Sequence, residues 1–136
     1  MIVEEFWIFY DNGEPIVHFL KDPSNPNSFI YQRVDINKLA GLLKLISGSS
    51  PSKNLNPIKL QNYKYLVTSC FRKKINIILK TDEFIKNKAI IKISKILCDM
   101  VENLYKIVDF INWNKDISLF EILKKKLNLF SKMSNL

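Results

Sequence analysis

The sequence predicts an α+β sandwich, in which helices cover a sheet of five antiparallel strands. Short apolar runs bounded by turn residues fall into two groups, and three longer segments repeat apolar residues at helical spacing. The expected order is two strands, a helix, three strands and two helices. The 136 residues, 47% of them apolar and 25% charged, suit one domain spanning residues 1–136, and a chain of this size needs no metal or disulfide to fold.

The chain opens with a predicted hairpin. Residues 6–10 and 15–20 are apolar runs on either side of Asn12-Gly13, and Asn-Gly between two such runs is a strong hairpin signal. Residues 22–28 contain two prolines and are predicted to form a loop, because proline disfavours both helices and strand ladders. A lone hairpin is unstable in water, so we expect it to pair with the later strands.

A helix is predicted from Asp35, a suitable N-cap, to Ser47-Gly48. Its apolar residues recur every three or four positions, as on one buried face: Ile36, Leu39, Leu42, Leu43 and Ile46. A second loop, residues 49–57, follows this helix. The next apolar runs are separated by tight reversals, which predicts an antiparallel meander at residues 58–61, 65–71 and 75–80.

Two helices complete the predicted domain. Thr81 or Asp82 is expected to cap a long helix that runs to about Ile111, and residues 113–116 interrupt the helical pattern. Ser118 and Glu121 have the spacing of a capping box, so a final helix is predicted to begin there.

Three stretches of the chain, together with the element order, resemble the longin (SNARE-like) domain. They are Phe6–Gly13 with Pro15–Val17, Leu39–Leu43, and Trp113–Phe120. The profilin-like and roadblock domains are near alternatives. A roadblock domain would open with a helix, whereas this chain opens with a predicted hairpin.

The resemblance implies a non-enzymatic scaffold for protein interactions. Longin-like domains are found in vesicle-trafficking proteins, where they form homo- or heterodimers, or bind a small GTPase or a folded-back peptide, through sheet edges and the first helix. No heptad segment or membrane anchor follows the domain in this sequence. We therefore expect a stand-alone subunit that binds a small GTPase, another longin- or roadblock-type chain, or a second copy of itself.

The residues themselves predict no catalytic, cofactor-binding or metal site, so we expect no enzyme activity. His18 is the single histidine, which excludes zinc sites built on several histidines, and we expect it to be a strand residue satisfied by its neighbours. The three glycines are isolated, so no phosphate-binding glycine loop is present. The carboxylate pairs Glu4-Glu5 and Asp82-Glu83 fall at expected element boundaries, where solvated or capping roles are favoured.

A partner surface is predicted on the first helix and the strand that follows it. Leu45 lies off the buried face of the helix, and Ala40 and Gly41 weaken the helix, which makes sense if another molecule approaches closely there. The strand at residues 58–60 is a candidate open edge, suited to dimerisation or strand addition. We define the partner surface as Lys38, Leu42, Leu45, Ile58 and Leu60.

The net charge of +8 makes a nucleic-acid-binding module the alternative function. Residues 36–80 carry nine basic and no acidic side chains, and we define a basic stretch within them: Lys59, Lys64, Arg72, Lys73 and Lys74, with Lys124–Lys126 later in the chain. Interleaved Tyr63, Tyr65 and Phe71 are typical of a stacking platform for single-stranded nucleic acid. Attraction to anionic lipid and a merely solvated surface are the other interpretations.

The composition of the charge favours a protein partner over nucleic acid. Of the 21 basic residues 19 are lysine, whereas nucleic-acid recognition favours the planar fork of arginine. The chain has two cysteines, Cys70 and Cys98, and no secretory signal, which predicts reduced thiols and a cytoplasmic protein, with peripheral contact at an anionic membrane left open. Whether the two cysteines approach each other is also left open.

Overall fold

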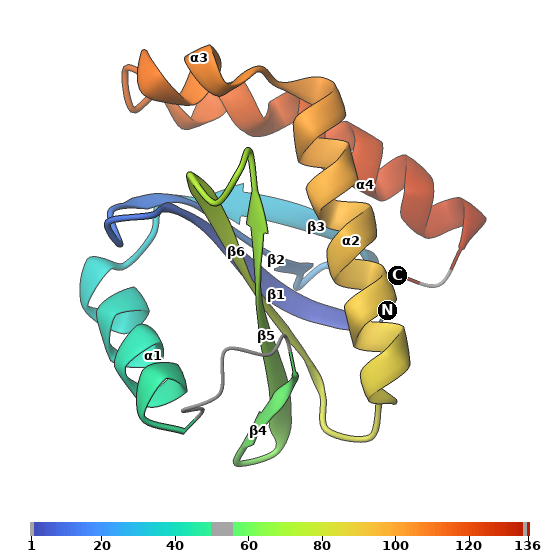
Figure 1. Cartoon of the computed structure of the whole chain (residues 1–136). Helices are drawn as coiled ribbons and strands as arrows, with labels where there is room; N and C mark the ends of the chain where they lie inside the picture. Colours follow the sequence, from blue (N-terminus) through green and yellow to red (C-terminus); the bar gives the residue numbers. More distant parts are fainter. Residues whose placement is uncertain (1, 50–55, 135) are drawn as a thin grey trace.

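The computed structural model describes residues 2–49, 56–134 and 136, and it is built on one antiparallel sheet of six strands (Figure 1). The strands lie side by side in the order β3-β2-β1-β6-β5-β4. Their bounds are β1 Val3–Tyr10, β2 Pro15–Asp22, β3 Asn25–Gln32, β4 Ile58–Leu60, β5 Tyr63–Cys70 and β6 Ile75–Asp82. The helices are α1 Ile36–Ser49, α2 Asn87–Leu104, α3 Ile107–Ile111, the 3₁₀ turn η1 Ile117–Phe120 and α4 Glu121–Met133. The α+β class and the antiparallel sheet are therefore as predicted.

The prediction of five strands is wrong, because β3 occupies most of the segment predicted to be a loop. Only Pro23 and Ser24 form the turn, in which the Asp22 carboxylate accepts hydrogen bonds from the backbone N–H and the hydroxyl of Ser24 at 2.9 and 2.7 Å. Pro26 is tolerated because β3 is the last strand on its side of the sheet, where an N–H facing away from β2 is not needed.

The predicted hairpin and meander meet as expected. β1 pairs with β6 along most of its length, from Val3 opposite Thr81 to Tyr10 opposite Ile75, so the two halves of the sheet are joined at its centre. The predicted loop at residues 49–57 falls largely on residues 50–55, which lie outside the described residues.

The helices divide between the two faces of the sheet (Figure 1). α2 and α4 cover one face over a large core in which Phe6 stacks on Phe19 with ring centroids 4.8 Å apart. α1 lies on the other face, where a smaller core forms from five buried residues: Trp7, Phe9, Leu39, Ile46 and Ile78. Asp35 caps α1 as predicted, since its carboxylate accepts the backbone N–H groups of Asn37 and Lys38 at 3.0 and 3.2 Å.

The long helix predicted at residues 82–111 is shorter and is interrupted. β6 extends to Asp82, α2 begins at Asn87, and Tyr105 ends α2 with extended backbone. Tyr105 is held there because its ring is buried and its hydroxyl donates a hydrogen bond to the Leu119 carbonyl at 2.9 Å. The predicted capping box of Ser118 and Glu121 does not form: Ser118 lies in the 3₁₀ turn that leads into α4, and Glu121 is the first residue of α4.

The described ends of the chain lie together. The Leu136 carbonyl accepts the backbone N–H of Ile2 at 2.6 Å, and the labels N and C are adjacent in Figure 1. None of the described helices has the length and apolar character needed to cross a bilayer.

Candidate functional site

The predicted partner surface lies where α1 faces the β4 end of the sheet. Lys38, Leu42 and Leu45 follow one another at spacings of four and three residues, so they share one face of α1. Leu42 is half-buried and packs against the core beneath α1, whereas Lys38 is exposed and Leu45 is 59% exposed. The exposure of Leu45 is as its position off the buried face predicted.

Ile58 and Leu60 contribute the other half of the partner surface. Both are half-buried and pack against the same small core as Leu42, while Lys59 between them points to the opposite face of the sheet. β4 is the last strand of the sheet on this side. Its outer backbone groups face away from β5, which is the arrangement that accepts an added strand.

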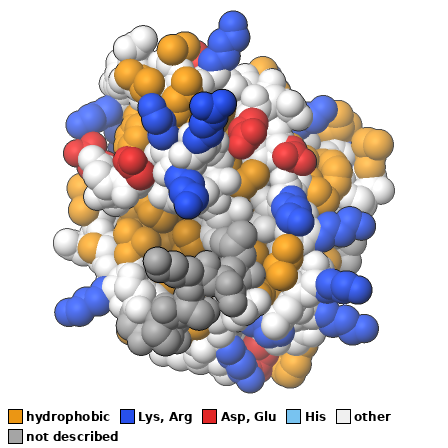
Figure 2. All heavy atoms as spheres, in the orientation of Figure 1, with side chains coloured by type: hydrophobic (Ala, Val, Ile, Leu, Met, Phe, Trp, Pro, Cys, Tyr) orange, Lys and Arg blue, Asp and Glu red, His pale blue; other side chains and the backbone are white. Residues whose placement is uncertain are grey.

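Apolar side chains remain at the surface between α1 and the sheet. Figure 2 shows them gathered beside α1, to the left of centre. Half-buried apolar residues at the rim of the small core account for such a patch: Val34, Leu42, Leu43, Ile58, Leu60, Tyr65 and Val67. Among the helices that the structure describes, α1 packs on this face, whereas α2 and α4 cover the other.

Gly41 lies on the exposed side of α1. Apart from its chain neighbours and the backbone of α1 around it, a Cβ atom added to Gly41 would meet no described atom within 4 Å, so no other described part of the chain approaches the helix at this point. The suggestion that another molecule approaches there stays a prediction.

The basic stretch does not form one patch. Lys59 in β4 lies opposite Lys64 near the beginning of β5, whereas Arg72–Lys74 form the turn after the end of β5. The eight-residue strand β5 therefore separates the two groups by about 25 Å. Lys59 pairs with Glu83 at 3.0 Å, and the Lys64 ammonium donates to the Ile85 carbonyl at 2.7 Å. Two of the five basic groups are therefore engaged within the chain.

The predicted stacking platform is also absent from the described residues, because its three aromatic side chains lie on opposite faces of the sheet. Tyr65 packs on the α1 side, and the ring of Tyr63 lies beneath the Lys80 ammonium at 4.0 Å on that side. Phe71 packs on the α2 side against Phe110, with ring centroids 5.7 Å apart. Alternation along a continued strand would place all three rings on one face, but β5 ends at Cys70 and the left-handed backbone of Phe71, with φ of 51°, turns its ring to the other face.

A buried charged cluster, consisting of Glu5, His18 and Lys80, was missed at the level of sequence. The Glu5 carboxylate lies 2.6 Å from His18 Nε2 through one oxygen and 2.9 Å from Lys80 Nζ through the other. The side chain of Glu5 is 14% exposed and lies inside β1, so the expectation that Glu5 is a solvated boundary residue is wrong. Burial favours the neutral acid, but the hydrogen bonds from His18 and Lys80 outweigh it and lower the pKa of Glu5 to about 2.

Both ring nitrogens of His18 are occupied, as expected of a strand histidine satisfied by its neighbours. The side-chain nitrogen of Gln32 lies 3.1 Å from His18 Nδ1. Because the Gln32 amide N–H donates this hydrogen bond, His18 Nδ1 is the acceptor. In a neutral imidazole the proton then lies on His18 Nε2, which donates to the Glu5 carboxylate. Neither nitrogen is left for a substrate. The cluster therefore acts in the structure by tying β1, β2 and β6 together.

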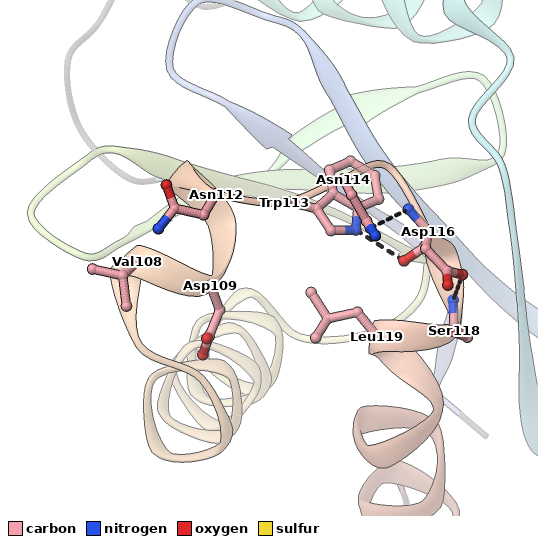
Figure 3. Close-up of a pocket in the computed structure, with 8 residues that line it drawn as sticks. All are labelled: Val108, Asp109, Asn112, Trp113, Asn114, Asp116, Ser118 and Leu119. Atoms are coloured by element: carbon pink, nitrogen blue, oxygen red, sulfur yellow. Dashed lines mark hydrogen bonds between the residues drawn. The ribbon is translucent and has the colours of Figure 1, made fainter.

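A hollow of about 440 Å³ lies between α3 and the segment that leads into η1 (Figure 3). Its polar groups bond to one another: the Trp113 indole N–H donates to the Asp116 carbonyl at 2.9 Å, and the Asp116 carboxylate accepts the backbone N–H of Ser118 at 2.9 Å. Asp109 likewise accepts the backbone N–H of Lys106 at 2.8 Å. These bonds hold the loop that lines the hollow in shape.

No cluster of three or more metal-ligating side chains occurs among residues 2–49, 56–134 and 136. No protein-family model matches the chain, and a search of curated proteins finds no significant match. The candidate functional site is therefore defined by geometry alone, as the exposed face of α1 together with the edge strand β4.

Proposed function

We propose that this chain is a non-enzymatic scaffold that binds another protein through α1 and β4. One observation carries the proposal: Leu45 is exposed on the same face of α1 as the half-buried Leu42, and Leu42 packs against the same small core as the two apolar side chains of the edge strand β4. This arrangement suits a protein partner. Such a partner can cover the apolar side chains and can add a strand along the outer edge of β4.

The class of partner is inferred from the resemblance to longin domains and from the charge. A longin-type scaffold binds a small GTPase, or another longin- or roadblock-type chain including a second copy, in a membrane-trafficking context. The net charge of +8 favours an acidic partner surface and orients the encounter. The division of the basic stretch between two ends of β5 leaves the nucleic-acid alternative without a continuous surface to support it.

The experiment combines light scattering of the purified chain with pull-down of purified small GTPases loaded with GDP or a GTP analogue. Leu45→Asp and Leu60→Asp are expected to abolish whichever association the unaltered chain shows, because each places a charge in the apolar contact. The matched control is Leu129→Asp on α4, since Leu129 is 55% exposed on the other side of the sheet.

Equal loss of binding in Leu129→Asp and Leu45→Asp would argue against the proposed surface, and so would binding that survives both partner-surface variants. Retention on oligonucleotide that falls steeply with salt would support the nucleic-acid alternative instead. Retention on anionic liposomes alone would point to a membrane surface.

A further inference from the structure

The two cysteines meet in the core between the sheet and α2. Cys70 is the last residue of β5, Cys98 lies in α2, and their sulfur atoms are 2.9 Å apart although 28 residues separate them in sequence. A disulfide bond joins two sulfurs at about 2.05 Å. The sulfurs of Cys70 and Cys98 are therefore less than an ångström beyond bonding distance, and both belong to regular elements that hold them there.

The surroundings of the two sulfurs differ. The Cys70 thiol donates a hydrogen bond to Cys98 Sγ, and the Thr68 hydroxyl lies 3.6 Å from the same sulfur. The bond from Cys70 lowers the pKa of Cys98, burial opposes this, and Thr68 adds to the lowering. The same bond, followed by burial, raises the pKa of Cys70. Cys98 is also the more accessible of the two, at 7% exposure against 1%.

A metal site does not account for this pair. A structural zinc ion requires four ligands, and the described residues contain no third cysteine, histidine or carboxylate grouped with these two sulfurs. Two thiols in contact, without further ligands, are the arrangement from which a disulfide forms.

We propose that Cys70 and Cys98 form a reversible intramolecular disulfide when the chain meets a hydroperoxide. The Cys98 thiolate attacks the peroxide oxygen, which gives the Cys98 sulfenic acid and, after uptake of one proton, water. The Cys70 sulfur then attacks the Cys98 sulfur and a second water leaves. In total two thiols lose two hydrogen atoms and hydrogen peroxide is reduced to two waters; a dithiol reductant reverses the change.

The bond would join the strand next to β4 to the helix on the opposite face. It would close a loop of 28 residues and so restrict the unfolded chain, which is expected to raise the Tm by about 10 °C. The oxidised chain would be the more stable form, and a reductant would return it to the original Tm.

The test uses the full chain, reduced and then treated with a small excess of hydrogen peroxide. Trypsin cleavage after Lys64, Arg72, Lys95 and Lys106 places the two cysteines in separate peptides, residues 65–72 and 96–106. We expect mass spectrometry to find these two peptides linked, in a chain that remains monomeric on a non-reducing gel, and the Tm to rise. Met100 lies in the second peptide, so its oxidation is counted separately.

Single variants assign the roles of the two thiols. In Cys70→Ala the Cys98 sulfenic acid is expected to persist and to be trapped by dimedone, whereas Cys98→Ala is expected to give neither a linked peptide nor a rise in Tm. Should an alanine variant not fold, titration of the unaltered chain against reduced and oxidised dithiothreitol decides the matter. Two thiols that stay free in the folded chain, or disulfides formed only between chains, would overturn the proposal.

Discussion

The imidazole of His18 lies flat against the indole of Trp7, with ring centroids 4.7 Å apart and ring planes inclined by 5°. The two residues are direct partners across β1 and β2, so the contact is a cross-strand pair on the α1 face. Trp7 shields one side of the imidazole while Glu5 and Gln32 occupy its nitrogens. His18 is thus fixed in orientation by three neighbours.

Glu5→Gln is expected to lower the free energy of unfolding by about 3 kcal/mol, because it leaves the half-buried Lys80 ammonium without its carboxylate. The measurement is urea denaturation at neutral pH. The control is Glu4→Gln: Glu4 pairs with Lys21 at 3.0 Å but is 33% exposed, so its loss is expected to cost under about 1 kcal/mol. Equal effects of the two variants would contradict the role assigned to Glu5.

The contribution of Glu5 depends on pH in a defined direction. Its pKa is about 2 in the folded chain against an ordinary value of 4.5, so the unfolded chain binds the proton more readily. The stabilisation is complete above about pH 4.5 and is lost as the pH falls toward 2. The difference in unfolding free energy between the unaltered chain and Glu5→Gln should therefore shrink from pH 6 to pH 3, and a constant difference would contradict this.

Tyr105→Phe is expected to lower the free energy of unfolding by about 1 kcal/mol, because it removes the hydrogen bond from the tyrosine hydroxyl to the Leu119 carbonyl and leaves the ring in place. Tyr105→Ala also removes the ring that packs against Phe110 and Phe120, and is expected to cost about 3 to 5 kcal/mol. Thermal unfolding of the two variants distinguishes the contribution of the hydroxyl to stability from that of the ring. Similar losses in the two variants would show that the ring contributes little and would contradict this prediction.

Lys73→Gly is expected to stabilise the chain by up to about 1 kcal/mol. Phe71, Arg72 and Lys73 have consecutive φ values of 51°, 55° and 73°, which is left-handed backbone that disfavours side chains other than glycine. Lys73 is exposed, so no packing is lost. Lys74, the next residue, is the control: its φ is not positive, and Lys74→Gly is expected to destabilise the chain because glycine adds entropy to the unfolded state.

Local signals predicted the local parts of the fold well. The Asn12-Gly13 turn and the Asp35 cap each depend on residues close in sequence, and both form as predicted. β3 was missed because Pro26 is a strong breaker unless its strand lies at a sheet edge, and the edge position depends on how the whole sheet assembles. The end of α2 at Tyr105 likewise depends on a partner, Leu119, that lies outside the helix in η1, 14 residues further along the chain.

The charged cluster shows why the site could be predicted only in part. Glu5, His18 and Lys80 come from three strands, and a register shift between Ile8 and Phe9 changes which residues oppose each other across the hairpin. Counting outward from the turn therefore does not place His18 beside Glu5. The exposure of Leu45 was easier to predict, since helical spacing within α1 determines which side of the helix it occupies.

The two edge strands of the sheet, β3 and β4, differ in how readily they can pair with a strand from another copy of the chain. Growth at the β3 end is hindered by Pro26, which supplies no N–H to a neighbouring chain, whereas β4 offers its outer backbone. If two copies joined about a twofold axis, β4 of one copy would pair with β4 of the other. Both ends of the combined sheet would then be β3 strands. Such a pair would be finite: it would stop at two copies and not extend into a fibre.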